Sequence, residues 1–219
     1  QLSSIESFNL ENQSFHDKLI ELRKNNPARF GEIYDNINLN ARFRSLFTSK
    51  RFLELFSEAL QVDINKIYVN GFMLRFDAPM DRRNSLDWHQ DSPYYMMSSP
   101  KFNAGVCWMS VTKNSAENGT LVYIPNTHSY YLNADSTKTD NYTSEQFHID
   151  ISQAELKRAK NLDQDFGDLS LLHMNIKHRS GSNNSSKVRI TAGCRFHDMS
   201  NSFNSGKEIY QFNDIKFNK

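Results

Sequence analysis

The stretch KIYVNGFMLRF, residues 66–76, marks the point at which the chain changes from helical to strand-like spacing. Further strand-like runs follow it at 103–112, 119–124, 146–150, 167–172 and 187–196. Segments rich in turn-forming residues separate these runs at 79–84, 98–101, 113–118 and 180–186. Many short strands with turns between them predict a barrel or a two-sheet sandwich. The fold class expected from this pattern is mainly β.

Upstream of this stretch, residues 1–60 have helical spacing. A first apolar stripe ends at Asn25-Asn26-Pro27, a second helical pattern covers 28–36, and a third follows Ser49, a candidate N-cap. The polar segment 132–145 is expected to be a mobile loop, and no internal repeat occurs. We therefore expect one domain over 1–219, in which a helical flank at 1–60 precedes a β-core at 65–200.

The charge balance limits the kinds of partner. Lys and Arg total 26 against 25 Asp and Glu, and this near balance argues against a nucleic-acid or membrane-surface protein, which needs a concentrated cationic field. No apolar run approaches the roughly 20 residues of a membrane span. Cys107 and Cys194 lie in apolar, strand-like runs, which predicts buried free thiols in a reducing, cytoplasmic compartment. A small molecule is the expected partner, and no feature indicates an oligomeric state.

Common catalytic motifs are missing from the sequence. It contains no Cys-x-x-Cys, His-Glu-x-x-His, Gly-x-Gly-x-x-Gly, Walker A or Gly-x-Ser-x-Gly pattern. Two His-x-Asp patterns are present, at His89–Asp91 and His148–Asp150. Residues i and i+2 of a strand share a face, so such a pair, with a second histidine from another strand, can hold a ferrous ion and leave about three positions open.

Sequence context favours neither pair decisively. His148 and Asp150 precede a polar, helix-like stretch and suit a solvated edge strand. His89 and Asp91 lie between Trp88 and the run PYYMM at 93–97, whose apolar and aromatic side chains suit a site that excludes water. A turn-rich loop separates His178 from Arg189, and an arginine there suits a carboxylate ligand.

Several motifs in order closely resemble the phytanoyl-CoA dioxygenase family. They are WHQDSPYY at 88–95, CW at 107–108, ENGTLVYIPNTH at 117–128, GDLSLLHMNIKHRSGSN at 167–183 and RITAGCRF at 189–196. The resemblance covers about 70–200 and implies a double-stranded β-helix, or jelly roll, that uses Fe(II), 2-oxoglutarate and O₂. Position by position, it implies the iron ligands His89, Asp91 and His178. It implies that Arg189 anchors 2-oxoglutarate, with Trp108 and Arg75 beside the cosubstrate.

Two further histidines fall within these motifs. Relatives also have a histidine near the position of His173, and the later histidine is the ligand, so we expect His173 to have a supporting, structural role. His128 is expected to order the Pro-Asn-Thr-His turn through hydrogen bonds.

The resemblance implies hydroxylation of an aliphatic C–H of a small metabolite, with release of succinate and CO₂. Asp91 indicates oxygen chemistry rather than halogenation, because halogenating relatives have a small residue there. Desaturation and cyclisation stay open, as does the substrate, for which Arg82 and Arg83 are candidate contacts with an anionic group. Two alternatives also stay open: a non-catalytic metal-binding jelly-roll module and a cupin-type isomerase.

Overall fold

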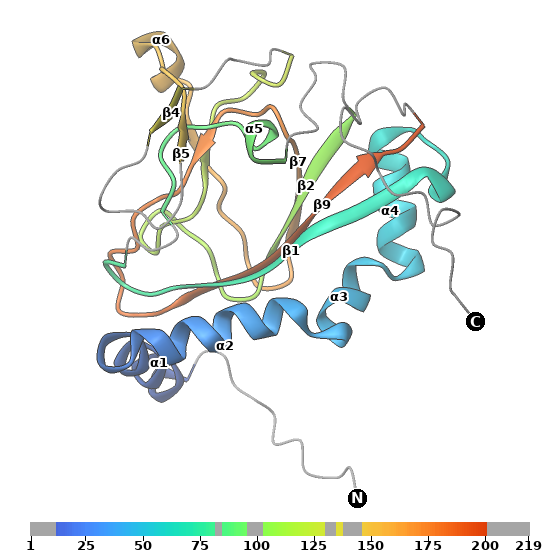
Figure 1. Ribbon diagram of the computed structural model, residues 1–219. Coiled ribbons are helices and arrows are strands. Elements are labelled where there is room, and N and C mark those ends of the chain that lie inside the picture. Colours follow the sequence, from blue (N-terminus) through green and yellow to red (C-terminus); the bar gives the residue numbers. More distant parts are fainter. Residues whose placement is uncertain (1–11, 82–84, 96–102, 130–134, 138–145, 201–219) are drawn as a thin grey trace, which may run out of the picture.

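A computed structural model describes residues 12–81, 85–95, 103–129, 135–137 and 146–200. Two antiparallel sheets form the body of the protein (Figure 1). The larger has the order β1-β9-β2-β7, with β1 at Ile67–Asp77, β9 at Arg189–Asp198, β2 at Ala104–Ser110 and β7 at Leu169–His173. The smaller has the order β6-β3-β8, with β6 at Lys160–Asn161, β3 at Val122–Tyr123 and β8 at His178–Arg179. The expectation of a mainly β, jelly-roll fold is confirmed.

The two faces of the larger sheet have different chemistry, because successive residues of a strand point to opposite sides. On β9, Ala192, Cys194 and Phe196 pack into the main apolar core. Arg189 and Arg195 lie at odd-numbered positions of the same strand and line a cavity on the other face. The period of two therefore assigns one face of β9 to packing and the other to polar groups.

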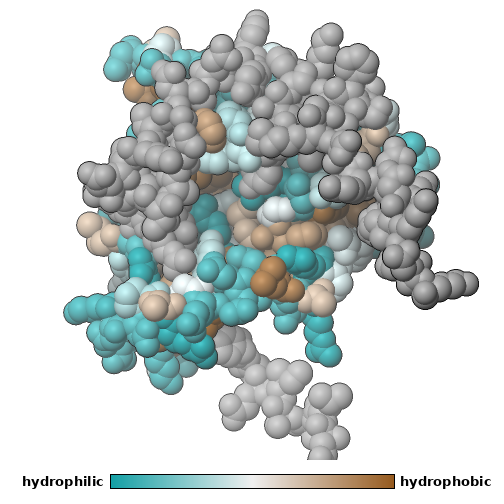
Figure 2. All heavy atoms as spheres, in the orientation of Figure 1, coloured by the Kyte–Doolittle hydropathy of each residue, from teal (hydrophilic) through white to brown (hydrophobic). Residues whose placement is uncertain are grey.

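Four helices precede the sheets. They are α1 at Gln13–Asn25, α2 at Pro27–Leu39, α3 at Ala41–Phe47 and α4 at Lys50–Leu60. Figure 1 shows them along the β1 and β9 side of the larger sheet, and Figure 2 shows that the outward surface of α1 and α2, at the lower left, is mostly hydrophilic. Asn26 caps α2 through its side chain and Pro27 takes the first position, which explains the break that the sequence indicates.

Two details of this helical flank differ from the sequence expectation. The helix α3 was not predicted; Asn40 starts it by accepting hydrogen bonds from the backbone N–H groups of Arg42 and Phe43. Ser49 does occupy the N-cap of α4, but its side chain makes no capping hydrogen bond.

Aromatic stacking joins α4 to the sheet. The rings of Phe56 and Phe196 stack with centroids 4.3 Å apart, and both side chains are buried. A Cβ at Gly105 would lie 2.4 Å from the Phe196 ring, so the absence of a side chain there makes room for the stack. Cys107 and Cys194 face each other across the β2–β9 pair as buried free thiols, as predicted.

Short elements complete the described chain: the 3₁₀-helix η1 at Ile64–Lys66, α5 at Ser92–Tyr95, α6 at Gln153–Leu156, and the pair β4 at Asp135–Thr137 with β5 at Gln146–His148. The loop expected at 132–145 is therefore wrong for 135–137, which form a strand, while 132–134 and 138–145 lie outside the described residues. None of the helices in the described ranges has the length and apolar character needed to cross a bilayer.

Candidate active site

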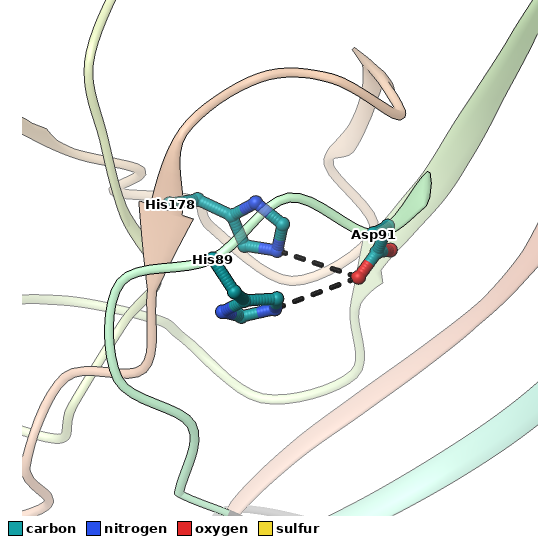
Figure 3. A group of neighbouring side chains, drawn as sticks. All are labelled: His89, Asp91 and His178. Carbon is teal, nitrogen blue, oxygen red and sulfur yellow. Dashed lines mark ion pairs between the residues drawn. The ribbon is translucent and has the colours of Figure 1, made fainter. Parts of the chain in front are cut away.

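Backbone pairing brings two distant histidines together. His89 and His178 form an isolated antiparallel bridge, in which the N–H of each donates to the carbonyl of the other at 2.9 and 3.0 Å. Asp91 follows two residues later, and its N–H donates to the Met174 carbonyl at 2.9 Å. The three side chains point toward one another from these segments (Figure 3).

The geometry of this cluster suits a single cation. His89 Nε2 and His178 Nε2 lie 3.5 and 3.7 Å from the same oxygen, Asp91 Oδ1. Candidate ligand atoms of the three residues all lie within 4.8 Å of one another, and all three side chains are buried. It is the sole such grouping of His, Cys, Asp or Glu among the described residues.

Hydrogen bonds at the far side of each ring orient both imidazoles. His89 Nδ1 lies 2.6 Å from the Asp87 carbonyl, and His178 Nδ1 lies 2.9 Å from the Ile176 carbonyl. A carbonyl only accepts, so each Nδ1 carries the proton and each Nε2 presents its lone pair. Metal-binding histidines have this arrangement, so the donor set fits a divalent ion such as Fe(II).

Electrostatics also favour the metal-binding protonation states. Burial, together with the neighbouring His89, lowers the pKa of His178 to about 4, so its imidazole is neutral near pH 7. Burial alone would raise the pKa of Asp91, but Arg195 and the two imidazoles outweigh it and hold that pKa well below its usual range. The cluster therefore offers a carboxylate at Asp91 and a neutral imidazole nitrogen at His178.

Arg195 contacts the carboxylate oxygen that faces away from the histidines. Its Nη2 lies 3.2 Å from Asp91 Oδ2, and its Nη1 donates to the Gly71 carbonyl at 3.2 Å. Gly71 has φ +55° and lies where the register of β1 with β9 shifts. The sequence analysis did not single out Arg195, although its even spacing from Arg189 on one strand places both on the same face.

Arg189 and Arg75 share the carboxylate of Asp77, whose side chain is 11% exposed and which the sequence analysis also missed. Arg189 Nη2 lies 2.6 Å from Asp77 Oδ2, and Arg75 Nη2 lies 3.1 Å from Asp77 Oδ1. Burial alone would raise the pKa of Asp77, but the two guanidinium groups outweigh it and lower that pKa. Within the described chain, Arg189 Nε and Nη1 are buried and have no hydrogen-bond partner. These unused donors make the guanidinium of Arg189 a candidate to hold the distal carboxylate of 2-oxoglutarate.

One cavity joins the histidine cluster to this arginine pair. Its lining includes the metal-site residues His89, Asp91 and His178. It also includes the residues expected beside the cosubstrate, Arg75, Trp108 and Arg189. The apolar part of the wall consists of Val106, Leu121, Leu172 and Ile176. The guanidinium of Arg75 lies 5.4 Å from the centroid of the Trp108 ring. The six residues expected at the metal and cosubstrate positions therefore line one space.

The remaining residues considered in the sequence lie partly inside and partly outside this cavity. Asp150 is exposed, and neither it nor His148 is part of a candidate metal cluster in the described ranges. His173 does line the cavity, and its Nδ1 accepts a hydrogen bond from the Asn175 N–H at 3.0 Å. Arg82, Arg83, Met96 and Met97 lie outside the described residues.

The expectation for His128 is wrong. Its side chain is exposed, and among the described residues no hydrogen bond to it is found. Thr127 orders the turn instead, because its Oγ1 donates to the Ile124 carbonyl at 2.8 Å and accepts from the Lys177 N–H at 3.0 Å. Thr127 is buried inside the turn, so its hydroxyl reaches both backbone groups.

Several solved structures have the same fold. ThoJ, described as a non-heme monooxygenase, is 18% identical with a TM-score of 0.59, and the match covers 85% of this chain and 70% of that one. EctD from S. alaskensis with bound Fe is 17% identical with a TM-score of 0.57, and the match covers 75% of this chain and 56% of that one. EvdO2 from Micromonospora carbonacea var. aurantiaca, complexed with 2-oxoglutarate, is 18% identical with a TM-score of 0.55, and the match covers 71% of this chain and 62% of that one.

Because these sequence identities are below 20%, the similarities establish the fold alone. The chain spans less than two thirds of the length of EctD and EvdO2. A comparison with curated proteins gave no match. The family model for phytanoyl-CoA dioxygenase (PhyH) matches residues 13–191, most of the chain. The chain therefore belongs to the phytanoyl-CoA dioxygenase family of non-haem Fe(II)- and 2-oxoglutarate-dependent oxygenases.

Proposed function

We propose that this protein hydroxylates an aliphatic C–H bond of a small metabolite and converts 2-oxoglutarate and O₂ to succinate and CO₂. One observation carries the proposal: His89 Nε2, His178 Nε2 and Asp91 Oδ1 face one another in a buried cavity. These three residues would hold Fe(II), and the helical flank and β-core would act as one oxygenase domain. When bound, the iron supplies the activation of O₂ that C–H oxidation requires.

The cosubstrate position is proposed at the arginine end of the cavity. Arg189 would bind the distal carboxylate of 2-oxoglutarate through one of its unpartnered donors, Nε or Nη1, while its Nη2 donates to Asp77. Asp77 also balances part of the charge of Arg75 and Arg189, which would otherwise repel each other in a buried space. The indole Nε1 of Trp108 is buried and has no partner within the described chain, so it is a further donor beside the cosubstrate.

Other residues keep the reacting groups in place and exclude water. Tyr94 lies edge-on to the His89 ring at 5.7 Å, and its hydroxyl accepts a hydrogen bond from the Phe147 N–H at 3.0 Å. This contact joins α5 to β5 beside the His89 ring. The apolar wall of the cavity suits an aliphatic part of the substrate. Exclusion of water strengthens each charged contact inside the cavity.

Substrate-stimulated succinate formation tests this function. The Fe(II)-loaded protein should release succinate from 2-oxoglutarate in the presence of O₂, faster with the correct metabolite than without it. In the absence of O₂, addition of 2-oxoglutarate should produce a visible charge-transfer band. A metal-binding module would give neither result. An isomerase would convert its substrate without O₂ and without succinate.

A further inference from the structure

Four arginines line the cavity, and three of them have a carboxylate partner. Arg75 and Arg189 share Asp77, and Arg195 contacts Asp91. Arg179 is different, because no carboxylate of the described chain lies within ion-pair distance of it. Its charge is therefore available to a ligand.

Two contacts hold the Arg179 side chain in place. Its guanidinium carbon lies 5.5 Å from the centroid of the Trp88 ring, and its Nη1 donates to the Ser180 carbonyl at 3.2 Å. A guanidinium has five N–H donors, and the described contacts use one of them. Stacking on an aromatic ring restricts a side chain that would otherwise lose conformational entropy on binding a ligand.

The position of Arg179 connects it to the metal site. It follows His178 in β8, and Val122 of β3 pairs with it. Together with Leu86 and Ser180, it lines both the inner cavity and an adjoining outer hollow. A substrate that enters from this hollow therefore passes Arg179 before it reaches the histidines.

Two carboxylates also line the outer hollow, and neither neutralises Arg179. Asp81 pairs with Arg23, with Nε 2.5 Å from Oδ2. Asp87 is exposed, and its Oδ1 accepts a hydrogen bond from the Trp88 N–H at 2.8 Å. Neither carboxylate is within ion-pair distance of Arg179, so the guanidinium keeps its charge at the junction of the two spaces.

We propose that the substrate carries a carboxylate or phosphate group that Arg179 binds, while its aliphatic part lies against the apolar wall. This inference rests on the proposed function and adds the chemical class of the substrate. The anionic group would fix which carbon faces the metal site, because Arg179 lines the same cavity as the ligand His178 and is restrained by Trp88. Arg179 is thus a specificity-determining residue, separate from the Arg189 position for 2-oxoglutarate.

Matched charged and neutral probes test the inference. Hexanoate and hexyl phosphate would be compared with hexanamide and hexan-1-ol, each titrated without O₂ into protein loaded with Fe(II) and 2-oxoglutarate. Binding would be read from tryptophan fluorescence, since the chain has 2 tryptophans, Trp88 and Trp108, both at the site, and from shifts of the charge-transfer band. The anions should bind about tenfold more tightly than the neutral probes.

Three variants show whether this preference comes from Arg179. R179Q should remove it, and R179K should retain part of it, because lysine keeps the charge but not the planar stacking. K160Q removes an exposed charge from β6 of the same sheet and should bind the probes as the wild type does. Equal circular dichroism and unfolding midpoints would establish that the variants fold.

Two kinds of result would overturn the inference: no charge preference in the wild type, including no binding by any probe, or an unchanged preference in R179Q. Failure of the proposed function is distinguishable. It would leave the charge-transfer band absent with 2-oxoglutarate alone, while fluorescence would still report whether anions bind through Arg179.

Discussion

Replacing Arg189 with methionine should separate cosubstrate binding from metal binding. Arg189 is 3% exposed, so its replacement has to fill a packed position. Methionine is long and unbranched and would occupy most of that volume without a charge. The substitution removes the guanidinium that is proposed to bind the distal carboxylate of 2-oxoglutarate, including the buried donors Nε and Nη1 that have no partner in the described chain. Asp77 loses one partner but keeps Arg75 at 3.1 Å, so its carboxylate does not become an isolated buried charge.

The expected loss follows from the strength of a charge-assisted hydrogen bond. Such a bond contributes about 1.5–3 kcal/mol, and a buried one at the upper end of this range contributes about 3 kcal/mol. That free energy corresponds to roughly a 100-fold increase in the dissociation constant for 2-oxoglutarate. Metal affinity should change far less, because Arg189 does not contact His89, Asp91 or His178.

Calorimetric titrations without O₂ would measure both constants on the same protein, with Mn(II) as the metal and 2-oxoglutarate added to the metal-loaded form. Arg158→Met, the same substitution at an exposed arginine, is the control. Equal losses of metal and 2-oxoglutarate affinity, or an unchanged 2-oxoglutarate affinity, would refute the assignment of Arg189 as the anchor.

Three further outcomes are expected. His197→Gln should reduce the pH dependence of stability by about 1.4 kcal/mol per pH unit between about pH 6.5 and 4. Burial and Arg195 lower the pKa of His197 to about 4, so in this range that histidine is protonated only in the unfolded chain, and stability falls as the pH falls. His178, whose pKa is also lowered to about 4, keeps its own contribution in the variant. Urea titrations of the metal-free protein at several pH values would measure that slope. Asp91→Ala should lower Mn(II) affinity by roughly 100-fold or more, since the cluster's single anionic ligand is lost; near-normal affinity would exclude Asp91 as a ligand. Gly181→Ala should destabilise the protein by about 1–3 kcal/mol in thermal unfolding, because the new Cβ would lie 2.4 Å from the Thr120 carbonyl oxygen.

The sequence predicts features that depend on local pattern. Apolar spacing and the Asn25-Asn26-Pro27 break predict α1 and α2, and strand-like runs predict β1, β2, β7 and β9 to within a few residues. The family motifs select His89–Asp91 over His148–Asp150, a choice that strand spacing alone leaves open. Local pattern is informative in these cases because it is set by neighbours in the chain.

Features that depend on the register between strands could not be predicted in this way. Asp77 pairs with Arg189 because β1 and β9 align those two positions, and no spacing in the sequence specifies that alignment. The contact of Arg195 with Asp91 joins residues 104 positions apart. Similarly, β3 and β8 have two residues each, too few for an alternating pattern. The availability of Arg179 also becomes visible only when the partners of the other cavity arginines are known.

Anomalous diffraction from crystals grown without O₂ in the presence of Fe(II) would test the central claim most directly. The account predicts one strong anomalous peak, bonded to His89 Nε2, His178 Nε2 and Asp91 Oδ1, in the pocket lined by Arg189. Iron bound at another place, or held by fewer than these three atoms, would contradict it.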